Sequence, residues 1–232
     1  MEVGQEFGIR QLVRRTVMIN HLEASFPTGA WHYLPAVFSE DMAEYRDFMQ
    51  QQLAADYRLT VSLGGSFVGN DISDYYFSPY ELGWGKVVKF DHEFIGRQAL
   101  EAEAANPKRG LVTLEWNSED VIDIYASMFR DGDVYDFLDI PTQERWVAWF
   151  DRVENDGNLV GLSTVPGYSF YFRKVLSLTV IDRELSTPGT SVEIVWGNPG
   201  SPQKLVRATV APAPYKRDNR RVNLEQFAAV SD

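Results

Sequence analysis

The chain has 232 residues, 44% hydrophobic and 13% aromatic, which is enough for one large domain or two small ones with a packed core. Acidic residues outnumber basic ones by 33 to 22, and the formal charge of −11 argues against binding to a phosphate backbone. The absence of cysteine excludes disulfides, thiolate nucleophiles and sulfur-based metal sites. The sequence contains no apolar stretch of membrane-spanning length and no secretory signal pattern, so it predicts a cytoplasmic protein without nucleic-acid or membrane partners.

The first half of the sequence predicts two helices. The first is expected over residues 39–57, with Ser39 as its cap. The second is expected to begin near residue 92 or 93 and to end before Asn106-Pro107, because proline disfavours helix in the residue that precedes it. We place the boundary between two domains at this point, which gives domains of residues 1–105 and 106–232. The apolar positions of the first helix recur at helical spacing: Met42, Tyr45, Phe48, Met49 and Leu53.

Beyond the boundary the apolar pattern changes to the period of two that is typical of strands. Two segments have the composition of hairpin turns, Asp131-Gly132 and Asn155-Asp156-Gly157-Asn158. The second half is therefore predicted to be a mostly antiparallel β domain, either a barrel or a sandwich. Residues 119–156 hold eleven acidic and three basic residues, and we interpret them as a solvated rim of this domain. Strands are expected over residues 111–116, 175–181, 191–196 and 205–210.

Generic catalytic templates do not occur in this sequence. It contains no Gly-x-Gly-x-x-Gly, no phosphate-binding loop and no Gly-x-Ser-x-Gly, and its three histidines lack the spacing of a helical metal pair. The most informative segment is residues 70–97, which combines aromatic rings, acids and an arginine with several glycines. This composition suits either a pocket for a flat ligand with polar edges or a core strand followed by a helix.

Several motifs in and around this segment resemble those of a known family. They are Asn20-His21-Leu22-Glu23-Ala24, Ser78-Pro79-Tyr80-Glu81-Leu82-Gly83-Trp84, Lys89-Phe90-Asp91, Phe94-Ile95-Gly96-Arg97, Ala99-Leu100 and Gly161-Leu162-Ser163-Thr164-Val165-Pro166-Gly167-Tyr168-Ser169. Together they resemble the glycine-cleavage T-protein (aminomethyltransferase) family. The paired Tyr75-Tyr76 and the Ala213-Pro214-Tyr215 segment resemble in particular the branch of tetrahydrofolate-dependent O-demethylases that act on methoxylated aromatic acids such as vanillate and syringate.

The resemblance implies an α+β protein with a ferredoxin-like folate-binding segment, followed by an antiparallel β-barrel or jelly-roll domain. It implies transfer of a methyl group from a methoxylated aromatic acid to tetrahydrofolate. Two alternatives remain open. One is a glycine-cleavage aminomethyltransferase, which would need a lipoylated carrier protein. The other is a folate-binding or assembly module without catalytic activity.

The resemblance also assigns roles to individual residues. Glu23 occupies the position of the family's glutamate that hydrogen-bonds the pterin edge, although without the motif it would be taken for a surface residue. Tyr75 is expected to be the catalytic residue that protonates the leaving phenolate. Tyr76 belongs to the cofactor-binding set and is the alternative to Tyr75, because neighbouring side chains of a strand face opposite ways.

Two further positions belong to the cofactor-binding set. Trp84 supplies either a stacking wall for the folate or packing at a domain junction. Arg97 pairs either with a carboxylate of the folate tail or with a structural acid such as Glu93. The resemblance implies that family members carry a further N-terminal segment, which we expect to be missing from this chain. We therefore expect a partner chain or self-association near Phe7, Ile9 and Leu12.

Overall fold

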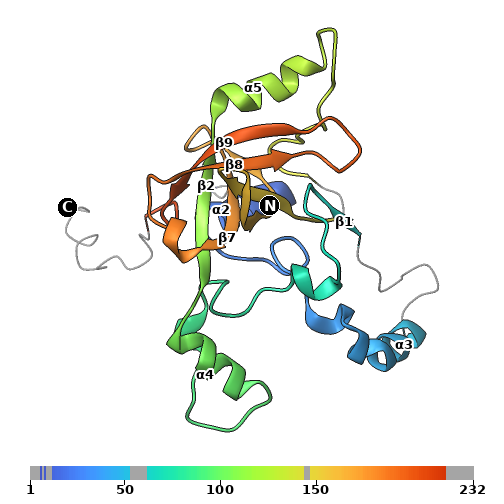
Figure 1. Ribbon diagram of the computed structural model, residues 1–232, viewed down its shortest axis with the longest axis vertical. Helices are drawn as coiled ribbons and strands as arrows, with labels where there is room; N and C mark the ends of the chain where they lie inside the picture. Colours follow the sequence, from blue (N-terminus) through green and yellow to red (C-terminus); the bar gives the residue numbers. More distant parts are fainter. Residues whose placement is uncertain (1–5, 7, 9–11, 53–61, 144–146, 218–232) are drawn as a thin grey trace.

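A closed antiparallel barrel forms the centre of the structure, a computed structural model that describes residues 6, 8, 12–52, 62–143 and 147–217 (Figure 1). Its six strands follow the order β2-β9-β8-β4-β5-β7, and β7 pairs back with β2 to close the ring. A short strand, β6, extends the sheet along β7. The strands are β2 (Arg109–Trp116), β4 (Asp151–Asn155), β5 (Asn158–Ser163), β6 (Gly167–Ser169), β7 (Lys174–Asp182), β8 (Ser191–Trp196) and β9 (Lys204–Ala211).

The alternating apolar side chains predicted from the sequence fill the interior of the barrel. Alternate apolar residues of β2, β8 and β9 are buried in one hydrophobic cluster, because neighbouring side chains of a strand point to opposite faces. The four strands expected beyond the boundary are therefore confirmed, and the choice between barrel and sandwich is settled in favour of the barrel. The buried members on these three strands are Val112, Leu114, Trp116, Val192, Ile194, Trp196, Val206, Ala208 and Val210.

One of the two predicted hairpin turns is confirmed. Asp156 and Gly157 connect β4 to β5 with φ angles of 50° and 77°, the left-handed values that a tight hairpin turn requires. Asp131-Gly132 does not connect strands. It follows α5 (Ser118–Ser127), a helix that the sequence reading missed by treating residues 119–156 as a solvated rim.

Helix α5 has a start signal that could have revealed it. The Asn117 side chain accepts hydrogen bonds from the backbone N–H groups of Glu119 and Asp120, at 3.0 and 3.1 Å, and so caps the first turn. Asp120 in turn accepts hydrogen bonds from Arg207 on β9, which fixes the helix to the barrel. The acidic residues at the start of this stretch thus complement the helix dipole and a barrel arginine.

The first half contains helices and short turns with little sheet. Its helices are α2 (Arg14–Glu23), α3 (Ala43–Gln52) and α4 (Arg97–Ala105), with 3-10 turns η1 (Ala36–Phe38), η2 (Glu40–Met42), η3 (Ile72–Tyr75) and η4 (Gly85–Val87). Among the described residues before 106, the only strand is β1 (Leu63–Gly64), which pairs with β3 (Ala148–Trp149). The expected ferredoxin-like segment is therefore not confirmed, because its ladder of several strands is not seen in this part of the chain.

The two predicted helices are confirmed with shifted starts. The first begins with η2, so Ser39 precedes a 3-10 turn, and residues 53–57 lie outside the described part. The second begins at Arg97, because Gly96 just before it has a left-handed backbone conformation (φ 91°) that does not continue a right-handed helix. This helix ends before Asn106, as expected. Helices α4 and α5 project from opposite ends of the barrel (Figure 1). No helix in the described ranges has both the length and the apolar character needed to cross a membrane.

A buried carboxyl joins the two halves of the chain. Asp151 on β4 accepts hydrogen bonds from the backbone N–H of Ser66, at 3.0 Å, and from the Trp149 indole, at 2.7 Å. The Ser66 hydroxyl also accepts a hydrogen bond from the backbone N–H of Arg152, at 2.9 Å. Burial raises the pKa of Asp151 from 3.8 to about 7, although these hydrogen bonds oppose the shift.

The raised pKa of Asp151 predicts a specific pH dependence of stability. Between pH 3.8 and about pH 7, Asp151 holds a proton in the folded protein that it has released in the unfolded chain. This contribution to stability is therefore complete below 3.8 and is lost as the pH rises through about 7. We expect the stability difference between wild type and Asp151→Asn to fall with rising pH, by up to about 1.4 kcal/mol per pH unit.

Urea unfolding at a series of pH values across this window measures that difference. Asp131→Asn, at an exposed position, is the matched control and should give a curve parallel to wild type. Parallel curves for wild type and Asp151→Asn would contradict the assignment of this proton to Asp151.

Candidate functional site

Glu23 lies at the end of α2, where this helix packs against β6. Its side chain is buried, with 5% exposed, and its Oε1 atom accepts a hydrogen bond of 2.6 Å from the Ser169 hydroxyl. Ile19 and Leu22 of the same helix pack against Leu178 of the barrel, which holds the last turn in place. The expectation that Glu23 without its motif would be a surface residue is wrong, because the barrel covers its side chain.

The close approach of α2 to β6 depends on a glycine. A Cβ atom at Gly167 would lie 2.5 Å from Leu22 Cδ1, 2.6 Å from Ile19 Cδ1 and 3.1 Å from the Pro141 carbonyl oxygen, so both side chains of α2 would have to shift. Gly167 therefore allows the apolar face of the helix to contact the strand that carries Ser169. This contact places the Glu23 carboxyl against the barrel.

The segment that follows β9 completes the surroundings of Glu23. The backbone N–H of Lys216 donates a hydrogen bond of 2.8 Å to the Glu23 carbonyl oxygen. The neighbouring Tyr215 hydroxyl donates to Glu115, at 2.7 Å, and Lys174 pairs with the other oxygen of that carboxylate, also at 2.7 Å. Burial and the hydrogen bond to Glu115 raise the pKa of Tyr215 to about 12, so this phenol stays protonated.

Aromatic rings line the surface beside this segment. Phe170 and Tyr171 at the turn after β6 are 71% and 75% exposed. Phe172 and Tyr215 meet edge to face at 4.8 Å, and the Lys216 ammonium lies over the Tyr171 ring at 5.2 Å. Glu23 is thus a buried carboxyl with an exposed aromatic surface close by.

A buried histidine lies beside the same helix end, and the sequence reading gave it no role. The backbone N–H of Thr28 donates to His32 Nδ1 at 3.0 Å, and the Thr28 hydroxyl lies 2.8 Å from His21 Nδ1. Burial lowers the pKa of His32 to about 3, so the ring is neutral. With Nδ1 accepting, Nε2 carries the proton, and no described residue accepts it.

Tyr75 lies in η3, and no contact among the described residues joins it to Glu23. It is buried against the rings of Phe67 and Phe150, with ring centroids at 5.1 and 5.2 Å. Its hydroxyl oxygen accepts a hydrogen bond of 2.8 Å from the backbone N–H of Gly69 and donates a longer one, 3.3 Å, to the Phe67 carbonyl. The tyrosine pair is therefore placed by a 3-10 turn and not by a strand.

Tyr76 is half-buried and borders a hollow of about 370 Å³ that Arg109 and Asp74 also line. Its hydroxyl is enclosed near Ser39 and Arg46, without a hydrogen bond of normal geometry to a described residue. Burial raises the pKa of Tyr76 above its ordinary value of 10.0.

The other two predicted residues lie in different surroundings. Trp84 is half-buried and meets Tyr33 edge to face at 5.4 Å. Arg97 forms ion pairs with Glu93, at 2.9 Å, and with Glu101, at 2.8 Å, along α4. The described contacts therefore do not join Glu23, Tyr75, Trp84 and Arg97 into one cluster.

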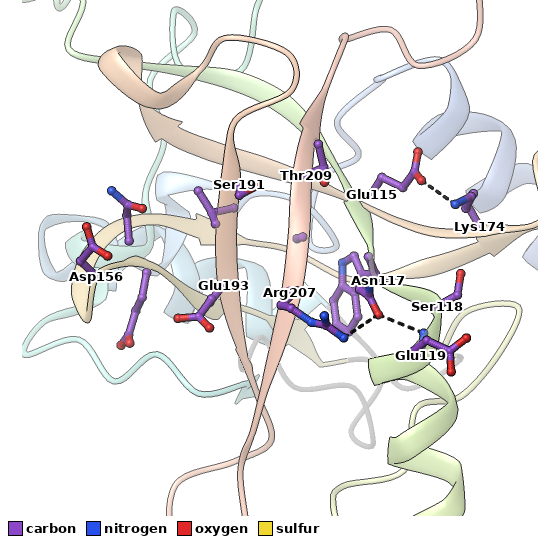
Figure 2. A pocket seen from close by; sticks show the side chains of 15 residues that line it. Glu115, Asn117, Ser118, Glu119, Asp156, Lys174, Ser191, Glu193, Arg207 and Thr209 are labelled. Atoms are coloured by element: carbon purple, nitrogen blue, oxygen red, sulfur yellow. Dashed lines mark hydrogen bonds and ion pairs between the residues drawn. The ribbon is translucent and has the colours of Figure 1, made fainter.

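A wide hollow of about 630 Å³ lies between β8, β9 and the β4–β5 turn, and it shares Glu115 and Lys174 with the surroundings of Glu23 (Figure 2). Five carboxylates line it, against two cations, and both cations are engaged: Lys174 with Glu115, and Arg207 with Asn117 and Asp120. An acidic hollow of this kind is poorly suited to a ligand that carries carboxylates. The candidate site is therefore the surroundings of Glu23.

The packing at Gly167 makes a testable prediction. We expect Gly167→Ala to destabilise the protein by about 1–3 kcal/mol, because the added methyl group overpacks the contact with α2. Urea unfolding at neutral pH measures this loss. Gly110→Ala is the matched strand control, since a Cβ there meets no atom within 4 Å. Equal stabilities of the two variants would contradict the packing argument.

Comparison with known proteins finds relatives over almost the whole chain, among them two curated proteins. A sesamin methylene transferase from Sinomonas sp. is 38% identical over 226 residues, which is 92% of this chain and 49% of that protein. A syringate O-demethylase from Sphingobium sp. is 34% identical over 223 residues, 91% of this chain and 47% of that protein. The chain thus spans about half the length of the curated relatives it matches.

No protein-family model matches the chain. Among solved structures, the glycine cleavage system aminomethyltransferase T from Bartonella henselae aligns with 60% of this chain and 32% of its own, with a TM-score of 0.40 and 15% identity. The resemblance found in the sequence is confirmed by the two curated relatives, and the chain is homologous to a syringate O-demethylase and a sesamin methylene transferase.

Proposed function

We propose that this chain is the folate-binding part of an enzyme that moves a one-carbon group from an aryl ether oxygen to tetrahydrofolate. The two relatives support the reaction class, since one is named for removing a methyl group from syringate and the other for transferring a methylene group from sesamin. The observation that carries the proposal is the buried Glu23 carboxylate. One of its oxygens is held by Ser169, and no described residue donates to the other.

The chemistry of Glu23 fits the pterin ring of a folate. An amino-pyrimidinone presents two parallel N–H groups, and a carboxylate is the side chain that accepts such a pair with charge-assisted hydrogen bonds. When bound, tetrahydrofolate supplies the nucleophilic nitrogen that receives the one-carbon group. Glu23 fixes the orientation of the ring, and its burial keeps competing water away from these hydrogen bonds.

Two further residues are proposed to contact the folate, as the sequence resemblance implies. Trp84 is half-buried against Tyr33, and the rest of its surface remains for stacking. Arg97 would release its ion pairs with Glu93 and Glu101 and bind the carboxylate tail of the folate instead. Breaking these ion pairs costs little, because they are on the surface. Tyr76, which the sequence resemblance also implies, completes the proposed folate set of Glu23, Tyr76, Trp84 and Arg97.

Tyr75 is the proposed general acid. Cleavage of the bond between the one-carbon group and the aryl oxygen leaves a phenolate, which takes up a proton. The Tyr75 hydroxyl accepts a hydrogen bond from Gly69, and its own proton is held only by a long contact of 3.3 Å to Phe67. A phenol held in this way can donate its proton to a better acceptor.

We also propose that a partner chain, or a second copy, completes the pocket for the aryl ether. Leu12 and Val13 before α2 are 65% and 59% exposed, which supports a contact at this position. Phe7 and Ile9, the other residues expected there, lie outside the described ranges.

The role of Glu23 is tested by calorimetric titration of tetrahydrofolate. We expect saturable binding to the wild-type chain and a loss of affinity of about 10- to 100-fold in Glu23→Gln, because an amide N–H then faces a donor of the pterin. Glu184→Gln, at an exposed position, is the matched control and should bind as wild type does. Wild-type affinity in Glu23→Gln, or no binding by the wild-type chain, would overturn the proposed folate site.

The role of Tyr75 is tested by the rate at which the phenol is released from syringate in the presence of tetrahydrofolate. We expect Tyr75→Phe to lower this rate by about 10²- to 10⁴-fold without changing folate affinity, because only proton donation is lost. Tyr45→Phe, at an exposed position on α3, is the control and should retain the wild-type rate. A loss of rate in Tyr76→Phe but not in Tyr75→Phe would assign the proton to Tyr76, and wild-type rates in both variants would exclude a tyrosine as the acid.

A further inference from the structure

The Ser169 hydroxyl lies between two fixed partners. Its oxygen accepts a hydrogen bond of 3.1 Å from the backbone N–H of Phe172, and its proton is donated to Glu23 Oε1 at 2.6 Å. A serine hydroxyl has a single proton, so with Phe172 donating to the oxygen, that proton is available for Glu23. The side chain is only 1% exposed, and solvent does not compete for it.

The backbone around Ser169 is equally constrained. The Ser169 carbonyl oxygen accepts a hydrogen bond of 2.7 Å from the backbone N–H of Arg173, and Ser169 pairs with Lys174 where β6 meets β7. The turn between these two strands therefore fixes the position and direction of the hydroxyl. The hydroxyl belongs to the barrel, whereas Glu23 belongs to a helix 146 residues earlier in the chain.

The hydrogen bond from Ser169 determines which lone pairs of the Glu23 carboxylate remain for a ligand. A glutamate side chain has three rotatable bonds, and ordering them at the moment of binding costs conformational entropy. The bond from Ser169 orders the carboxylate beforehand and takes one lone pair of Oε1. The second lone pair of Oε1 and those of Oε2 then remain for the two parallel N–H groups of the pterin.

We propose that Ser169 is a positioning residue for folate recognition, which acts through Glu23 and touches no ligand itself. The inference rests on the proposed function and deepens it. A purely structural Ser169 would only join α2 to β6, and its loss would weaken every ligand equally. A positioning Ser169 affects only the recognition that Glu23 performs.

The first experiment is a double-mutant cycle on tetrahydrofolate affinity with Ser169→Ala, Glu23→Ala and the double variant. We expect Ser169→Ala to weaken binding about 5- to 10-fold in the wild-type background and to have no effect in the Glu23→Ala background, since contacting residues are not additive. A folate analogue without the 2-amino group keeps only one of the two N–H groups that face Glu23, so Ser169→Ala should weaken its binding less than it weakens the binding of tetrahydrofolate. Ser163→Ala, which removes another buried barrel hydroxyl, is the matched control and should bind as wild type does.

A second measurement tests the positioning without any ligand. Three-bond couplings of the Glu23 side chain in labelled protein should report a single rotamer in wild type and averaged rotamers in Ser169→Ala. Ser169→Cys, which keeps the side-chain shape but donates only weakly, should behave like Ser169→Ala if folding of the alanine variant is in doubt. Thermal unfolding verifies that each variant is folded.

Three outcomes would overturn the inference: wild-type affinity in Ser169→Ala, an equal loss for the analogue together with additivity in the cycle, or a single Glu23 rotamer in Ser169→Ala. Failure of the proposed function looks different. In that case the wild-type chain binds no tetrahydrofolate, while the rotamer measurement still decides whether Ser169 orders Glu23.

Discussion

Pairing of β2 with both β7 and β9 is the constraint on which the remaining structure depends. Without it the sheet would have two open edges, and the apolar residues of β2, β8 and β9 would lose their common interior. Closure also fixes the outer surface of β7, where β6 continues the sheet and α2 packs. The position of Glu23 is thus a consequence of barrel closure, because Ile19 and Leu22 of the helix that carries it pack against Leu178 of the closed sheet.

The site holds the Glu23 carboxylate in a fixed position and leaves its Oε2 atom without a donor among the described residues. Gly167 brings α2 into contact with β6, Ser169 holds one oxygen of Glu23, and Lys216 holds the Glu23 backbone. A carboxylate prepared in this way can recognise a ligand with little further ordering, which is how preorganised sites gain affinity. The net charge of −11 does not indicate where such a carboxylate lies, since most of the acidic residues are on the surface. The hollow that five of them line is itself unsuited to a ligand with carboxylates, such as folate.

Two buried ionisable groups lie outside the proposed chemistry. Asp151 fixes residue Ser66 to the barrel, and its raised pKa reflects the cost of placing a carboxyl in the interior. His32 is kept neutral by the same physical cause and is connected through Thr28 to His21. Asp151 thereby connects the first half of the chain to the barrel, whereas the hydrogen bond between Thr28 and His32 fixes the turn that follows α2.

The sequence by itself determined the local features: the period of two in the barrel strands, the Asp156-Gly157 turn, the helix stop before Asn106 and the motif that contains Glu23. These depend on neighbouring residues, whose preferences are written in the chain. Only the tertiary structure decided that the sheet closes, that residues before 106 contain little sheet, that Tyr75 lies in a 3-10 turn, and that Ser169 holds Glu23 from 146 residues away. Such contacts, and the pKa values that burial produces, join positions far apart in sequence, and no local pattern encodes them.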